Sequence, residues 1–297
     1  MENIQPQGYN DIQTEPIKTS ELTNSTKLFM SSWNLFKQNW KILSSIALVP
    51  AVFMAIGQVA MISKLSSLSS FLLFFIFSLV GIIFSIAMQP AIINAIHLLS
   101  TEPGRLINIK DQYRFGFKLF WSMVFIAILY GLISVGSMVL FIVPAIIVGI
   151  YCSMYLYTRI IDGKKGLQAL EESYALVYGK WFKVLGRMAF LAVVYLVFSV
   201  VLMGLTFIIQ FLFGVKDGSV SAVLVSSLIN LIMSGVMVPL GLIYMYNLFI
   251  SMKSCRAVGV STGNFRKWII AFMVLGVIAL LGIITLMIVV SSSLNMK

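Results

Sequence analysis

The carboxylates that could serve as general acids or bases are few, and they cluster at one place. Of ten Asp and Glu residues, only Asp162, Glu171 and Glu172 lie together near the end of an apolar segment. Acid–base catalysis requires groups that are placed together, so a lipid-modifying enzyme that uses these carboxylates is one interpretation. The alternative is that Glu171 and Glu172 balance the charge of nearby lysines on a surface helix, and we favour it.

Residues that bind metal ions or form nucleophile pairs are also scarce. The chain has one histidine, His97, and its two cysteines, Cys152 and Cys255, lie far apart in the sequence. Metal sites need a cluster of such ligands, and neither a phosphate-binding loop nor a dinucleotide fingerprint is present. The sequence therefore predicts no cofactor, no metal site and no catalytic residue, and we expect that the protein is not an enzyme.

The polar residues inside the apolar segments are carboxamides rather than charged groups. Proton relays and many ion-coupled transporters place charged side chains within the bilayer, and the predicted spans contain none at mid-depth. Carboxamides often join membrane helices through hydrogen bonds, which is the role that we expect. A polar cavity is the alternative, and its candidate side chains are Gln89, Asn94, Asn230 and Asn247.

Three prolines could act as hinges around such a cavity. Pro90, Pro144 and Pro239 precede the next charged residue by 12, 15 and 14 positions, which indicates a similar depth for each. Proline frees a backbone carbonyl, and transporters use interrupted helices to bind substrates. Proline is also common in membrane helices that have no such role.

Long apolar segments position these residues. The chain has 297 residues, of which 60% are hydrophobic and 10% charged, and the charges leave six long uncharged runs. A helix needs roughly 20 apolar residues to cross a membrane, and the run 119–158 is long enough for two helices. We therefore predict an all-α polytopic transmembrane helical bundle of about seven spans, in which three hairpins form a six-helix core and a C-terminal helix follows. The expected spans are at about 42–62, 71–99, 119–138, 141–160, 185–212, 221–250 and 269–291.

Lys and Arg residues are distributed unevenly between the two sides of these spans. Eighteen of the 21 lie before the first, third, fifth and seventh spans, and only Lys64, Lys216 and Lys297 lie on the other side. Because Lys and Arg favour cytoplasmic loops, we predict a protein of the cytoplasmic (inner) cell membrane with its N-terminus inside and its C-terminus outside. A reporter fused after Lys297 should be active outside the cytoplasm, and activity inside would contradict the count of seven spans.

One phrase occurs twice in the chain. Residues 32–43 read SWNLFKQNWKIL and residues 173–185 read SYALVYGKWFKVL, and each has a Trp eight positions after its Ser. The helical spacing of the aromatic residues predicts amphipathic helices that lie in the headgroup plane at about 27–41 and 166–183. We interpret the phrase as an internal repeat of helical hairpins, and the reuse of ordinary membrane anchors is the alternative.

The predicted interfacial anchors are aromatic and cationic residues at the cytoplasmic ends of spans, where such residues are enriched. They are Trp33, Phe36, Trp40, Trp121, Trp181, Trp268, Lys37, Lys41, Lys180 and Lys183. The expected organisation is a disordered cytoplasmic tail at 1–26, a membrane domain at 27–255, and a cytoplasmic loop with the last transmembrane helix at 256–297.

Two stretches of the sequence resemble a known group of membrane proteins. They are SWNLFKQNWKIL and the segment from Phe141 to Leu185, in which a Pro-containing helix precedes the pattern Gly166, Ala169, Leu170, Ser173. The chain resembles uncharacterised multi-pass prokaryotic membrane proteins that are related to the membrane domain of glycerophosphoryl diester phosphodiesterases. Nothing in the sequence resembles the catalytic barrel of those enzymes, so the resemblance implies a membrane fold and no activity.

Besides the lipid-modifying enzyme, the sequence leaves two functions from different classes open. The first is a non-catalytic integral membrane protein that organises lipid or a partner membrane protein at the cytoplasmic face. The alternative is a permease for a neutral or weakly polar solute. The net charge of +11 lies beside membrane helices, so anionic headgroups are the expected partner and nucleic acid is not expected.

Overall fold

The computed structural model describes residues 21–62, 67–102, 104–140, 142–215, 219–256 and 260–295, and helices are its only regular secondary structure across these ranges. In chain order they are α1 (Ser25–Ile62), α2 (Ser67–Thr101), α3 (Ile109–Val139), α4 (Ile142–Cys152), α5 (Tyr155–Ile160), α6 (Leu167–Val177), α7 (Trp181–Leu212), α8 (Val220–Ser254) and α9 (Gly263–Asn295). Seven segments, with α4 and α5 taken as one, are long and apolar enough to cross a membrane. The predicted all-α, multi-pass membrane fold is confirmed.

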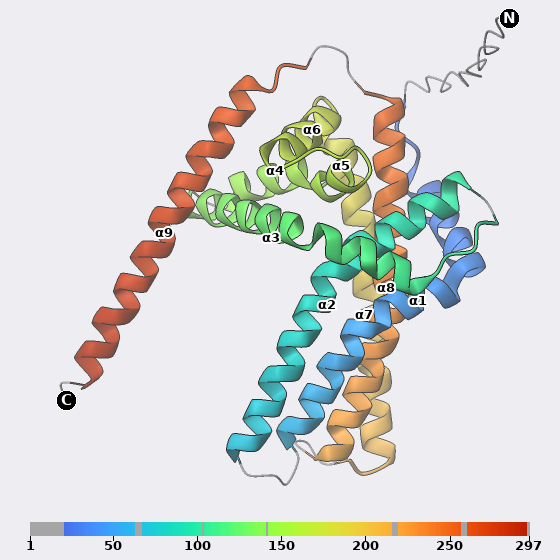
Figure 1. The fold of residues 1–297 in the computed structure, drawn as a ribbon, viewed down its shortest axis with the longest axis vertical. Helices are drawn as coiled ribbons and strands as arrows, with labels where there is room; N and C mark the ends of the chain where they lie inside the picture. Colours follow the sequence, from blue (N-terminus) through green and yellow to red (C-terminus); the bar gives the residue numbers. More distant parts are fainter. Residues whose placement is uncertain are drawn as a thin grey trace, which may run out of the picture.

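Helices α1, α2, α7 and α8 run side by side (Figure 1), and the main core also contains buried residues of α3, α4 and α5, among them Tyr113, Ile150 and Tyr157. Helix α1 has extensive contacts with both α2 and α8, and α7 has a smaller contact with α8. The largest fully buried side chains of this group include Leu43, Ile46, Ile92, Tyr244 and Phe249. Helix α1 is therefore the centre of the core, and α7 lies at its edge.

The hairpin of α3 and α4 runs across this group rather than along it (Figure 1). A close approach between α3 and α2 allows the crossing, since a Cβ atom on Gly116 would overlap the carbonyl oxygen of Ala87. Small residues permit such contacts between helix backbones. The three hairpins were predicted to form one six-helix core. The structure shows two that run side by side and a third that crosses them, and buried residues of all three hairpins belong to one core.

Helix α9 packs mainly on α3. The contact centres on Gly136 and Gly276, where an added Cβ would overlap the backbone of the facing helix in both directions. Much of the rest of α9 is exposed, including Leu281, Met287 and Ile288. The last helix is thus attached by this glycine crossing and by its buried first turns, where Phe265 stacks on Tyr174 of α6.

The two copies of the repeated phrase share a backbone break directly before their tryptophan. Asn39 interrupts α1 with φ −125° and ψ 18°, and its side-chain amide donates to the carbonyl of Leu35 (3.1 Å). Lys180, at the equivalent position of the second copy, has φ −127° and ψ 13° and caps α7. In both copies a surface helix therefore ends and a long apolar helix begins at Trp40 or Trp181. The internal duplication itself stays a prediction.

Two predicted boundaries differ from the structure. The disordered tail was predicted to reach residue 26, and residues 1–20 lie outside the described ranges. However, α1 begins at Ser25, Leu22 is buried, and Arg187 donates to the carbonyls of Leu22 and Thr23 (2.8 Å each). These contacts order the chain before the helix.

The second surface helix is also shorter than predicted. Helix α6 ends at Val177 instead of residue 183, and Gly179 follows with φ +74°. A glycine in this left-handed conformation ends a helix at low steric cost. Trp181 consequently begins the next helix instead of extending the aromatic stripe of α6.

Candidate functional site

A groove of about 550 Å³ lies between α1 and α8. Its α1 wall carries Phe36, Lys37, Trp40, Ser44 and Leu48, and its α8 wall carries Leu231, Ile232, Gly235 and Val236. Lys37 is the only charged residue among these, and apolar side chains form most of the remainder. The groove therefore combines one cationic group with an apolar channel.

Close packing of α1 on α8 fixes the shape of this groove. The hydroxyl of Ser44 is buried and donates to the carbonyl of Gly235 (2.6 Å). A Cβ atom on Gly235 would lie 3.3 Å from the side chain of Leu48, so the absence of a side chain lets the helices approach. Near the other end of the contact, Asn247 donates to the buried hydroxyl of Ser32 (2.9 Å).

The cationic end of the groove lies beside the break in α1. Lys37 precedes Asn39 and Trp40 follows it, and both Lys37 and Trp40 are exposed, Trp40 by 53%. Phe36 is only 5% exposed and belongs to the core. Lys37 and Trp40 are thus available to a ligand, whereas Phe36 supports the fold.

A second apolar groove continues the first along α1. It has a volume of about 600 Å³, it shares Leu231 with the first, and it extends past Val52 to Val59 with α2 forming a further wall. From Phe36 to Val59 the helix rises roughly 35 Å. The two grooves together are long enough to follow a lipid acyl chain from one membrane surface into the hydrocarbon core.

The other predicted anchors fall into two groups. Trp121 and Trp268 are 80% and 63% exposed, as expected for residues that face a membrane surface, and Lys41 and Lys183 are exposed as well. Trp181 is partly buried and donates to the carbonyl of Ile147 (3.4 Å). Trp33 is partly buried too and packs against the core.

Lys180 is engaged within the protein. Its ammonium group donates to the carbonyl of Cys255, and burial lowers its pKa. This contact joins the start of α7 to the end of α8. The predicted anchor Lys180 is thus less available to lipid than Lys37.

The four amides proposed for a cavity are not brought together. Asn94 donates to Gln112 of α3 (2.8 Å), and Asn247 donates to Ser32 of α1, so both join helices. Gln89 is exposed beside Pro90, and Asn230 lines a separate groove between α7 and α8. The expected role, joining helices through hydrogen bonds, therefore applies to Asn94 and Asn247.

The three predicted hinge prolines lie at different positions in their helices. Pro90 and Pro239 are buried inside the long helices α2 and α8, and α2 changes direction over its second half, which carries Pro90 (Figure 1). Pro144 is the third residue of α4, where the missing N–H costs nothing because the first turn of a helix has free N–H groups. Pro144 therefore begins a helix and does not bend one.

The clustered carboxylates are paired with one cation of α8, one of the segment between α8 and α9, and one of α9. Asp162 contacts Lys253 (2.6 Å), Glu172 contacts Arg256 (2.6 Å) and Glu171 lies 3.5 Å from Arg266. The buried oxygen Oε1 of Glu171 accepts no hydrogen bond, so the last pair is electrostatic only. This arrangement agrees with charge balance, and it links α6 to the segment after α8 and to the first turn of α9.

Within the described part of the chain, no three His, Cys, Asp or Glu side chains are grouped in a way that could hold a metal ion. His97 contacts the hydroxyl of Tyr246 (3.1 Å) between α2 and α8. Cys152 is buried and is not disulfide-bonded. His97 therefore joins two helices, and Cys152 is part of the packed interior.

Comparison with known proteins adds no relative. No family model, no curated protein and no solved structure matches the chain significantly. The resemblance to the membrane domain of glycerophosphoryl diester phosphodiesterases therefore stays a prediction.

The sequence indicated Phe36, Lys37 and Trp40 of the α1 wall only as interfacial anchors, and it indicated neither the groove nor its α8 wall. Nothing in the hydropathy of residues 231–236 distinguishes them from the rest of their span. The adjacent small residues Ser234 and Gly235 were the available signal, because small residues concentrate where membrane helices approach closely. The sequence does not say which helix they approach.

Proposed function

We propose that this protein is a non-catalytic integral membrane protein of the cytoplasmic membrane that binds anionic lipid at its cytoplasmic face. The observation that carries the proposal is the groove between α1 and α8, with Lys37 and Trp40 at one end and apolar side chains along its length. In this arrangement Lys37 contacts the phosphate of a lipid, Trp40 lies at headgroup depth, and an acyl chain follows Leu48 and Leu231.

The chemistry of the groove favours an anionic lipid over a soluble ligand. Its one cation is exposed at the end where the predicted topology places the cytoplasmic surface, and the rest of the lining offers few hydrogen-bonding groups. Tryptophan is enriched at that depth of the membrane. A soluble anion would leave the apolar part of the groove unoccupied, whereas an anionic lipid fills both parts.

The groove can be tested by measuring bound lipid after substitution of Lys37. The protein is purified in detergent, phosphatidylglycerol is added, and native mass spectrometry measures the fraction with one lipid bound. A cation near a headgroup contributes on the order of 1 kcal/mol, so Lys37→Gln should weaken phosphatidylglycerol binding about five-fold. Phosphatidylcholine binding should change less.

Lys41→Gln is the matched control, because Lys41 is exposed on the same helix but does not line the groove. Equal losses in the two variants would mean that only diffuse positive charge attracts the lipid, and would overturn the proposed site. Trp40→Ala tests the aromatic contribution at an exposed position. Phe36 is left unchanged, since its burial in the core means that its substitution would disturb the fold.

A further inference from the structure

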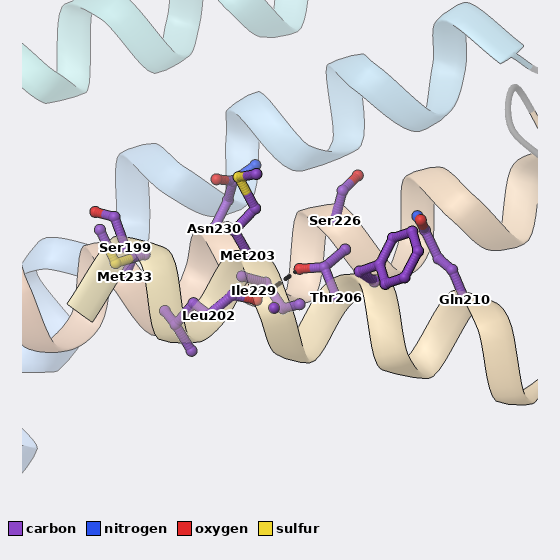
Figure 2. Close-up of a pocket in the computed structure, with 11 residues that line it drawn as sticks. Ser199, Leu202, Met203, Thr206, Gln210, Ser226, Ile229, Asn230 and Met233 are labelled. Carbon is purple, nitrogen blue, oxygen red and sulfur yellow. Dashed lines mark hydrogen bonds between the residues drawn. The ribbon is translucent and has the colours of Figure 1, made fainter. Parts of the chain in front are cut away.

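A third groove, between α7 and α8, carries more polar side chains than the two grooves along α1, beside apolar ones such as Met203 and Phe207. It has a volume of about 650 Å³ and its lining includes Ser199, Thr206 and Gln210 of α7 and Ser226 and Asn230 of α8. Figure 2 shows these side chains along the space between the two helices. No charged residue lines it. The groove is therefore hydrogen-bonding and neutral in character.

The hydroxyl groups that line this groove are hydrogen-bonded within the described part of the protein, whereas its two side-chain amides are not. The hydroxyls of Ser199, Thr206 and Ser226 each donate to a carbonyl of their own helix. The side-chain amides of Gln210 and Asn230 make no hydrogen bond to any part of the chain that the structure describes. A carboxamide can both donate and accept, and leaving it without a partner in hydrocarbon is unfavourable.

The groove opens toward the bilayer and not toward a central path. Helix α7 is at the edge of the core, and of its residues only Val184 and Leu202 are buried. Met203 and Phe207 line the groove and are themselves highly exposed apolar side chains. A molecule that enters from the lipid phase can thus reach the amides without passing through the protein.

The position of the amides along the helices fits a ligand that lies at the membrane edge. Gln210 is within one turn of the end of α7 at Leu212, and Asn230 is ten residues, roughly 15 Å, from the start of α8. The polar lining therefore starts near the α7–α8 connection and continues into the span. This end of the bundle is opposite to the predicted cytoplasmic end, where Lys37 lies.

From these observations we infer that the α7–α8 groove binds a neutral glycerolipid whose headgroup carries hydroxyl groups. The hydroxyl and ester groups of such a lipid provide partners for the amides of Gln210 and Asn230, and its chains pack against Met203 and Phe207. A phospholipid is disfavoured, because its phosphate would meet no cation among the lining residues. The inference does not depend on the anionic-lipid site, which uses the opposite side of α8.

Photo-labelling can test the site in the full-length protein. The protein is placed in phosphatidylcholine nanodiscs that contain a trace of diazirine-bearing diacylglycerol, and labelled peptides are mapped by mass spectrometry. We expect saturable labelling of α7 and α8. An excess of diacylglycerol should displace the label, and the same amount of phosphatidylglycerol should not. Non-saturable labelling, or equal displacement by phosphatidylglycerol, would overturn the inference.

A double variant and a matched control locate the site. Gln210→Leu with Asn230→Leu should lower the saturable labelling of α7 and α8 at least five-fold, whereas Gln89→Leu, which changes an exposed amide outside the groove, should leave it unchanged. Unchanged labelling in the double variant would contradict the inference. Cross-links from α7 to a second copy of the chain in place of the lipid would also contradict it, because the groove would then be an interface between copies. The competition measurement on the wild-type protein remains decisive if the double variant does not fold.

Discussion

Replacing Gly136 with leucine is expected to release α9 from the rest of the protein. The α3–α9 contact has no room for a side chain there, since even a Cβ atom would overlap the carbonyl oxygen of Phe272 and the backbone of Gly276. Overpacking a filled contact typically costs about 1–3 kcal/mol, and a collision with backbone is harder to relieve than one with a side chain. The cost falls on the larger of the two attachments of α9, the smaller being the stack of Phe265 on Tyr174 of α6.

A protease site introduced between α8 and α9 makes this release measurable. After cleavage in mild detergent, the α9 fragment of the wild-type protein should co-purify with helices α1–α8, and most of the fragment should be lost from Gly136→Leu. The matched control is Gly131→Leu in the same helix, where an added Cβ meets nothing within 4 Å. If α9 stays bound in the Gly136 variant, another contact holds the last helix.

The success of the sequence in predicting the spans has a simple physical basis. Apolar runs as long as 218–252 have no place in a soluble protein of this size, so hydropathy indicates the spans, and the length of the run 119–158 raises their number from six to seven. The crossing of α3 on α2, by contrast, brings Gly116 against the backbone of Ala87. A glycine contact of this kind involves residues that are distant in the chain, and no pattern within one helix indicates the partner.

The amphipathic helices show a second limit of sequence reasoning. The spacing of Phe29, Trp33, Phe36 and Trp40 correctly predicts that one face of the first helix is apolar, but it does not say what covers that face. In the structure Leu28 and Phe36 are buried in the protein core, and only Trp40 of the predicted stripe is largely exposed. Helix α6 is similar, with Leu170 and Ala169 fully buried. Both helices therefore attach to protein first, and their exposed ends remain available to lipid.

The serine at the start of each copy of the repeated phrase makes hydrogen bonds that hold its helix in place. Ser173 and Ser32 are both fully buried, and each connects its surface helix to another element. Ser32 donates to Leu28 of its own helix and accepts from Asn247 of α8. Ser173 accepts from the N–H of Met154 (3.0 Å) and donates to the carbonyl of Tyr151 (2.7 Å). The two residues that Ser173 contacts are on either side of the break between α4 and α5.

Substitution of Ser173 by alanine is therefore expected to destabilise the α4–α5 break. The change leaves the buried N–H of Met154 and the partly buried C=O of Tyr151 without the side-chain partner, and a buried group left unsatisfied costs about 1–3 kcal/mol. Water cannot easily replace the hydroxyl, because Ser173 and Met154 are both inaccessible. We expect a clearly lower melting temperature in detergent, together with faster hydrogen exchange in a peptide that covers residues 150–160.

Ser153→Ala is the control for this prediction, because Ser153 lies in the same break but donates only to Ile150 of its own helix (2.8 Å). It should change the melting temperature and the exchange rate little. If exchange at 150–160 is the same in the Ser173 and Ser153 variants, the hydroxyl of Ser173 does not hold the break. If exchange rises only in the Ser173 variant, α6 is an integral support of the fourth span, and its short apolar face is explained without contact with lipid.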